Sequence, residues 1–182
     1  PISGVINQVK FKLFNKKIND IKNPNILIAG CGTGQHSINS ARRFQNSNVL
    51  AIDLSLSSLA YAKRKTQELN FNNIEYLQAD ILNIEKLKRQ FDIVESVGVL
   101  HHMDDPIEGW KKLTACLKPN GLMKIGLYSQ LARQDVEKIR KKIKKLDFKT
   151  NDISMKLFRD ELINLGNENY KHITQANDFY CL

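Results

Sequence analysis

The chain has 182 residues, enough for one domain with a sizeable core, and its hydrophobic content of 42% is ordinary for a globular protein. The apolar runs are too short to cross a bilayer, and no signal-peptide pattern is present, so we expect no membrane partner. The net charge of +9 favours acidic partners, although an abundance of lysine and asparagine along the whole chain gives the same value without nucleic acid.

The first segment, residues 2–21, has the pattern of an amphipathic helix. Its apolar residues fall on one helical face, and its lysines lie elsewhere. We expect residues 1–24 to form an N-terminal helix that packs against the core or covers a ligand site. The Asn-Pro-Asn sequence at residues 23–25 ends this helix and starts the first strand.

The next segment predicts a strand, a glycine turn and a helix. The apolar run at residues 26–29 has the length and branching of a buried strand, and it stops at Gly30, Gly32 and Gly34. A helical pattern follows, so backbone N–H groups in the turn can approach a ligand closely. The dinucleotide fingerprint would place its third glycine at Gln35, so the spacing argues against a bound pyrophosphate.

A second apolar strand, residues 49–52, ends in Asp53. An acidic residue at the tip of this strand can accept two hydrogen bonds from a ribose diol. Ser55 is a candidate N-cap for a helix that runs through Leu69. A third strand follows at residues 74–79.

Asp80 ends the third strand, and it can cap a helix over residues 82–90. The fourth strand begins at Phe91, and its pattern continues to Met103. This segment includes His101 and His102, whose side chains would point apart on an extended chain. With only Asp104 and Asp105 nearby, we expect no metal site.

Asp105 and Pro106 predict the start of the next helix, because aspartate caps helices and proline suits the first helical position. We expect this helix to reach Leu117, with Trp110, Leu113 and Leu117 facing inward. Residues 118–121 form a turn, and the fifth strand spans residues 122–128.

Five strands that alternate with helices predict a parallel sheet covered by helices on both faces. Ligands of such sheets bind at the carboxyl ends of the strands, beside the first strand.

The remainder of the chain predicts two helices. The first has an apolar stripe and a basic opposite face, and the second has an apolar stripe of its own. The basic face is either solvated or binds an acidic partner such as nucleic acid. The stripe residues are Val136, Ile139, Ile143 and Leu146 in the first helix, and Met155, Phe158, Leu162 and Leu165 in the second.

The Gly-x-Gly-x-Gly loop, with a buried strand before it and Asp53 ending the next strand, resembles the first motif of class I S-adenosylmethionine-dependent methyltransferases, of the type 11/12-like kind. The resemblance extends from Asn25 to Ser129. It includes Leu-His-His at residues 100–102 and Leu-Lys-Pro-Asn-Gly-Leu at residues 117–122. The stretch from Tyr128 onward resembles methyltransferases of marine bacteria that carry tetratricopeptide repeats in longer chains, although no repeat is visible here.

This resemblance implies an α/β fold with a doubly wound, mainly parallel Rossmann-like methyltransferase sheet and helices on both faces. We expect residues 25–129 to form the S-adenosylmethionine-binding core and residues 130–182 a C-terminal helical extension. We find no hairpin pattern after the fifth strand, so we expect the family's final antiparallel hairpin to be missing and the chain to be a fragment of a longer protein.

The resemblance also implies the residues that bind S-adenosyl-L-methionine. Backbone groups at Gly30 and Gly32 would face its homocysteine part, and Asp53 would bind its ribose. Asp80 has two interpretations, a contact to the adenine amine or the helix cap described above. The full set of expected cofactor-binding residues is Gly30, Cys31, Gly32, Thr33, Gly34, Asp53, Leu54, Asp80, Ile81 and Val97.

The contact to the amino group of the cofactor and the general base are two features of the site that the resemblance does not assign. The family usually carries an acidic residue where this chain has Ile28, so other groups must hold the amino group of the cofactor. The sequence identifies no general base. By placement, His101 is the first catalytic candidate, followed by Tyr128 and Glu95.

The expected function is methyl transfer from S-adenosyl-L-methionine to a small molecule or peptide. One alternative is a nucleic-acid methyltransferase that uses the basic helices, although the Asn/Asp-Pro-Pro-Tyr/Phe motif of amino-methylating enzymes is missing. Another is a cofactor-binding module without activity. The three cysteines lie far apart and form no C-x-x-C pair, which predicts a reducing, cytoplasmic compartment and neither zinc nor disulfides.

Overall fold

The computed structural model describes residues 21–44, 46–129, 131, 133–145, 151–164 and 171–175. The chain divides into two compact units between Leu127 and Tyr128. The expected N-terminal helix falls almost entirely on residues 1–20, which lie outside the described residues. None of the described helices combines the length and the apolar character needed to span a membrane.

The first unit contains a five-stranded sheet in the order β3-β2-β1-β4-β5, and every neighbouring pair is parallel. This confirms the predicted parallel sheet, with β1 at the point where the strand order reverses. Among the described residues the sheet ends at β5, without an antiparallel hairpin. The strands are β1 Asn25–Ala29, β2 Asn48–Asp53, β3 Ile74–Gln78, β4 Phe91–Val97 and β5 Leu117–Gly126.

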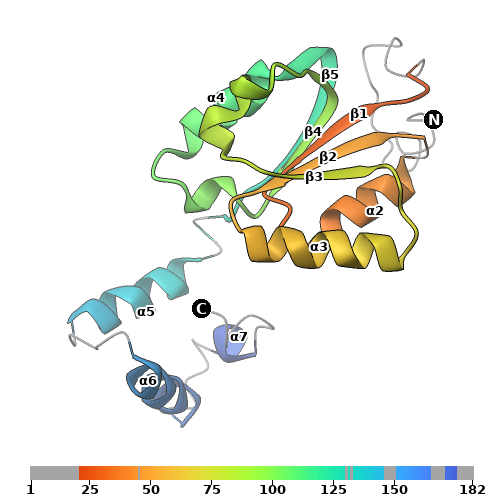
Figure 1. The fold of residues 1–182 in the computed structure, drawn as a ribbon. Coiled ribbons are helices and arrows are strands. Elements are labelled where there is room, and N and C mark those ends of the chain that lie inside the picture. Colours follow the sequence, from red (N-terminus) through yellow and green to blue (C-terminus); the bar gives the residue numbers. More distant parts are fainter. Residues whose placement is uncertain are drawn as a thin grey trace. The chain divides into compact units, whose positions relative to one another are not determined.

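Helices cover both faces of this sheet (Figure 1). Helices α2 (Gln35–Arg43) and α3 (Leu56–Glu68) lie on one face, and α4 (Pro106–Ala115) lies on the other. Successive side chains of a strand point to opposite faces, so β1 supplies both cores. Ile26 and Ile28 join the core beneath α2 and α3, whereas Leu27 and Ala29 join the core beneath α4.

Two predicted helix caps are confirmed. Ser55 Oγ accepts a hydrogen bond from the backbone N–H of Ser58 at 3.2 Å and begins α3. Asp105 Oδ1 accepts from the backbone N–H groups of Ile107 and Glu108 at 2.9 and 3.1 Å and begins α4, with proline in the first turn. Each such cap typically stabilises a helix by about 1 kcal/mol.

The segment after β3 and the end of β4 differ from the predicted helix and strand. The predicted helix over residues 82–90 is a 3₁₀ segment, η2 (Ile81–Leu87), which ends at Lys88 in a left-handed conformation with φ 48°. The fourth strand does not continue to Met103. It ends at Val97 because Gly98, with φ 77°, turns the chain into a short 3₁₀ segment, η3 (Leu100–His102).

The end of α4 and the start of β5 also differ from the prediction. The helix stops at Ala115, and Leu117 begins β5. Trp110, which the sequence pattern predicts to face inward, is 36% exposed, whereas Leu113 is fully buried. The predicted turn at residues 118–121 lies inside β5, where the pairing with β4 shifts register and Asn120 has φ 65°. An irregularity of this kind lets a strand absorb extra residues without leaving the sheet.

The second unit contains α5 (Gln134–Lys145), α6 (Asp152–Asn164) and α7 (Lys171–Thr174). Its core consists of Ile139, Phe158, Leu162 and Ile173, with Val136 and Ile143 packed against it. The predicted stripes are therefore confirmed at most positions. Met155 is 40% exposed instead of facing inward, and Leu146 and Leu165 lie outside the described residues.

Candidate functional site

A cavity of about 360 Å³ lies at the carboxyl ends of β1, β2, β3 and β4. This is the edge of a parallel sheet where ligands bind, at the switch point beside β1. Six of the residues that the sequence assigned to the cofactor border it. The cavity is lined by Gly30, Gly32, Asp53, Leu54, Ala79, Asp80, Ile81, Gly98, Val99, His102 and Met103.

The glycine loop approaches the segment after β4 so closely that a side chain would not fit. A Cβ atom built at Gly30 would lie 2.2 Å from Val99 Cγ2, and Gly30 has φ 77°. The backbone N–H groups of Gly30 and Cys31 both donate to the carbonyl of Ile52 at 2.9 Å. The loop is therefore fixed to β2 on one side and packed against Val99 on the other.

Asp53, at the end of β2, holds this loop with its carboxylate. Its Oδ2 accepts a hydrogen bond from the backbone N–H of Gly32 at 2.7 Å, and its Oδ1 accepts from the backbone N–H of Ser55 at 2.9 Å. The resemblance implies that backbone groups of Gly32 face the cofactor, and in this structure the N–H of Gly32 is bonded to Asp53. The carboxylate both shapes the loop and borders the cavity.

Beyond Asp53, the cavity wall combines two apolar side chains, Leu54 and Ile81, with the carboxylate of Asp80. Leu54 is 67% exposed, and its carbonyl accepts from Gln78 Nε2 at 2.9 Å, whereas Ile81 is buried. Asp80 Oδ1 accepts a hydrogen bond from the backbone N–H of Leu82 at 2.9 Å, so Asp80 caps η2. This agrees with the helix-cap interpretation, one of the two given for Asp80 above. Asp80 also borders the cavity, so the cap does not remove it from the site.

The segment after β4 supplies residues that the sequence analysis missed. Gly98, Val99 and Met103 border the cavity, and of the two adjacent histidines it is His102, not His101, that does so. The sequence pattern predicts a strand over this segment, and the glycine within that pattern is the signal of the turn. The two histidine Nε2 atoms lie 3.1 Å apart.

Four expected cofactor residues do not border the cavity. Val97 precedes the turn and is 42% exposed, and Thr33 points to solvent. Gly34 caps α2 and packs against α3. Cys31 is buried, and burial together with the charge of Asp53 raises the pKa of its thiol to about 12, so the thiol stays protonated and structural.

Glu95, a candidate base, faces α2 and does not border the cavity. It is 3% exposed, and its Oε2 lies 2.6 Å from both His36 Nε2 and Ser40 Oγ. Burial opposes its ionisation, but these hydrogen bonds and the charge of Lys124 together leave the pKa of Glu95 below its ordinary value. No local pattern predicts this contact, because β4 and α2 are far apart in the chain.

Tyr128, the remaining candidate base, lies outside the first unit. Tyr128 belongs to the second unit, where the guanidinium of Arg133 lies 4.0 Å from the centre of its ring. Within the part of the chain that the structure describes, no three His, Cys, Asp or Glu side chains are grouped to hold a metal ion.

Comparison with known proteins gives a family match over the first unit. Residues 26–121 match the family model described as a methyltransferase domain. The chain is 33% identical over 121 residues to an uncharacterized protein of Synechococcus sp., a match that covers 66% of this chain and 29% of that protein. It is 28% identical over 117 residues to the ubiquinone biosynthesis O-methyltransferase of Acinetobacter baumannii, covering 64% of this chain and 48% of the enzyme.

A solved structure supports the fold over more of the chain. PKMT2 from Rickettsia typhi, in complex with AdoHcy, superposes with a TM-score of 0.64 at 21% identity, covering 86% of this chain and 31% of that one. At this identity the likeness shows the fold alone. The chain spans less than half the length of these curated relatives.

Proposed function

Because this chain belongs to the methyltransferase domain family, we propose that it is an S-adenosylmethionine-dependent methyltransferase that holds its cofactor in the cavity beside β1. The observation that carries the proposal is Asp53, which ends β2 at the cavity and is bonded to the glycine loop. In this arrangement the carboxylate can accept hydrogen bonds from a ribose diol.

The residues of the cavity fit the parts of this cofactor. Leu54 and Ile81 offer apolar surface for the adenine ring, and Asp80 offers a carboxylate for the adenine amine. Gly30 and Gly32 leave the loop without side chains, so a ligand can approach its backbone.

The cofactor would supply an activated methyl group on a sulfonium. The role of the chain is then to hold donor and acceptor in line and to exclude water, and positioning of this kind lowers barriers by up to about 7–11 kcal/mol in ideal cases. His102 borders the cavity and is the side chain best placed to contact an acceptor or move its proton. The acceptor that we propose is a small molecule or a peptide, in line with the name of the ubiquinone biosynthesis relative.

A nucleic-acid acceptor is supported only by the basic face of α5. Several of its cations are already paired within the unit: Lys138 with Asp135 at 2.7 Å, and Arg140 with Glu137 at 3.2 Å. A binding affinity for single-stranded DNA or RNA that falls steeply with salt would favour this alternative. We further infer a cytoplasmic location, which the free thiols of Cys31 and Cys116 support.

Calorimetric titration of the 182-residue chain with S-adenosylhomocysteine tests the proposal. We expect saturable binding, with no comparable binding of NADH. Binding of NADH instead, or no binding of S-adenosylhomocysteine, would contradict it. If S-adenosylhomocysteine binds but no acceptor is methylated, the chain is a cofactor-binding module.

A further inference from the structure

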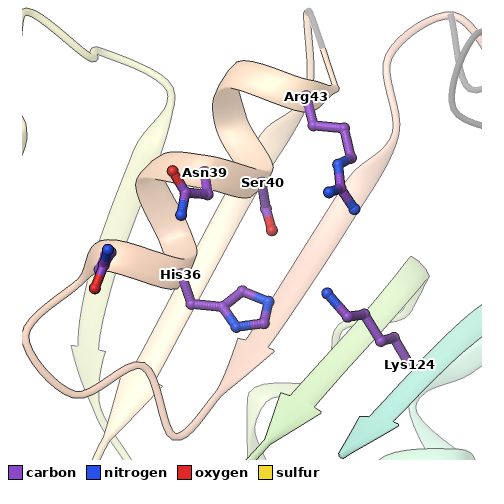
Figure 2. A pocket seen from close by; sticks show the side chains of 6 residues that line it. His36, Asn39, Ser40, Arg43 and Lys124 are labelled. Carbon is purple, nitrogen blue, oxygen red and sulfur yellow. The ribbon is translucent and has the colours of Figure 1, made fainter. Parts of the chain in front are cut away.

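A second cavity, separate from the one beside β1, lies between α2 and β5. It has a volume of about 280 Å³ and is lined by Gln35, His36, Asn39, Ser40, Arg43 and Lys124. Five of these residues come from one side of α2, and Lys124 comes from β5 (Figure 2). None of them borders the cavity beside β1.

The side chains around this cavity are all polar, and two of them, Arg43 and Lys124, carry a positive charge. In Figure 2, the amino group of Lys124 points toward the ring of His36, and the guanidinium of Arg43 extends toward the same space. Gln35 and Asn39 add two side-chain amides, which can donate hydrogen bonds. The cavity therefore gathers hydrogen-bond donors and positive charges from two elements.

The nearest acidic group, Glu95, interacts with the charge of Lys124 and offsets only part of the positive charge at the cavity. Glu95 lies beneath the cavity as the register partner of Lys124, but its Oε2 is already bonded to His36 and Ser40 at 2.6 Å. Among the described residues, neither Arg43 nor Lys124 forms an ion pair. Two cations against one buried carboxylate leave an excess of positive charge at the cavity.

The sequence before the described residues is also basic in composition. Residues 1–20 contain four lysines and a single acidic residue, Asp20.

We propose that the cavity between α2 and β5 binds a compact oxyanion, a phosphate or carboxylate group, through Arg43 and Lys124, with the side-chain amides of Gln35 and Asn39 as further donors. The guanidinium of arginine presents paired N–H groups that match two oxygens of such a group, and lysine adds a point charge. The volume suits a small ligand or the charged end of a larger one. This site does not depend on the cofactor site proposed above.

The test is calorimetry of the full 182-residue chain with inorganic phosphate and, separately, with malonate, at an ionic strength held constant with sodium chloride. We expect saturable binding of at least one anion. Binding of phosphate alone identifies a phosphate site, and binding of malonate alone identifies a carboxylate site. If neither anion binds more than chloride does, the proposal is overturned.

Variants locate the binding. Arg43→Gln and Lys124→Gln both change exposed side chains, and we expect each to weaken anion binding about tenfold, as the loss of one charge-assisted contact does. Arg42→Gln is the matched control, because Arg42 is the preceding residue of α2, is exposed and lies outside the cavity. An equal loss in Arg42→Gln would show attraction to net charge alone and would overturn the proposal.

Titration of the same variants with S-adenosylhomocysteine separates this site from the cofactor site. We expect Arg43→Gln to bind S-adenosylhomocysteine as the unaltered chain does. If the chain binds the anion but not S-adenosylhomocysteine, the proposed function fails and this site stands. If Arg43→Gln weakens both ligands equally, the two cavities are one site and the inference is wrong.

Discussion

Glu95 of β4 lies directly beside Ile28 of β1, as its register partner in the parallel sheet. Ile28 occupies the position where the methyltransferases that this chain resembles usually carry an acid. In this chain the carboxylate at this register position belongs to Glu95 of the neighbouring strand β4, and it is hydrogen-bonded to His36 and Ser40 of α2. The buried charge at this level therefore fastens α2 to β4.

Replacing Glu95 tests this role. We expect Glu95→Gln to lower the free energy of unfolding by about 1–3 kcal/mol, because it removes a buried, charged acceptor that His36 and Ser40 share. Urea denaturation measures the change. Glu75→Gln is the control, because its ion pair with Arg89 is exposed and should be worth less than about 1 kcal/mol. Equal losses in the two variants would show that the buried contacts of Glu95 stabilise the fold no more than an exposed ion pair does, which would contradict the prediction.

The pKa of Glu95 predicts how this contribution varies with pH. It lies below the ordinary value of 4.5 in the folded protein, so the unfolded state binds the proton more readily. The stabilisation is then complete above the ordinary value and is lost as the pH falls through the lower, folded-state value. Unfolding curves of the unaltered chain and of Glu95→Gln should converge on acidification from about pH 4.5 downward. A gap that persists unchanged at every pH where both proteins fold would contradict the assignment.

The close approach at Gly30 predicts a difference between two glycines of the same loop. Gly30→Ala would combine a left-handed backbone, costing roughly 1–2 kcal/mol, with a clash against Val99 of similar size. Gly32→Ala also strains the backbone, at φ 52°, but nothing lies within 4 Å of its added methyl group. Denaturant unfolding should therefore show the larger loss for Gly30→Ala.

A second substitution separates the clash from the backbone strain. Adding Val99→Ala to Gly30→Ala removes the two methyl groups nearest to the new Cβ. Gly30→Ala should therefore cost less free energy of unfolding when it is made in the Val99→Ala protein than when it is made in the unaltered chain. If the losses of Gly30→Ala and Val99→Ala simply add in the double variant, the close contact does not cause the instability of Gly30→Ala.

The elements that sequence reasoning placed well are those whose signals are local. The branched apolar run before Gly30, and the caps at Ser55 and Asp105, each determine their structure within a few residues. The prediction failed where contacts between distant segments decide the outcome. The strand signal of residues 91–103 gave no sign that Leu100 would leave the sheet and become buried in the core beneath α4.

The same distinction explains the site. Asp53 and the glycines could be placed because they follow strands directly, and parallel strands bring their carboxyl ends together. His102 was missed in favour of His101 because their order around the cavity depends on the turn at Gly98 and on the 3₁₀ segment after it. The pair of His36 and Glu95 joins residues 59 apart in sequence, which no local pattern shows.

The two adjacent histidines therefore predict different effects on the cofactor. His102 borders the cavity beside β1 and His101 does not, so His102→Gln should reduce the thermal stabilisation by S-adenosylhomocysteine more than His101→Gln does. Thermal unfolding with and without the ligand measures the shift. A larger effect of His101→Gln would contradict this prediction and would favour His101, the candidate that the sequence analysis placed first.

Asp53 predicts a loss of both binding and stability, because one carboxylate borders the cavity and holds the loop. We expect Asp53→Ala to weaken S-adenosylhomocysteine binding by about 1–3 kcal/mol, which is roughly 5–150-fold in the dissociation constant. It should also lower the free energy of unfolding, because the N–H groups of Gly32 and Ser55 lose their acceptor. Asp104→Ala is the matched control, since Asp104 is exposed and lies outside the cavity. If Asp53→Ala unfolds more easily but binds the cofactor product unchanged, the carboxylate only shapes the loop and the ribose must be held by another group.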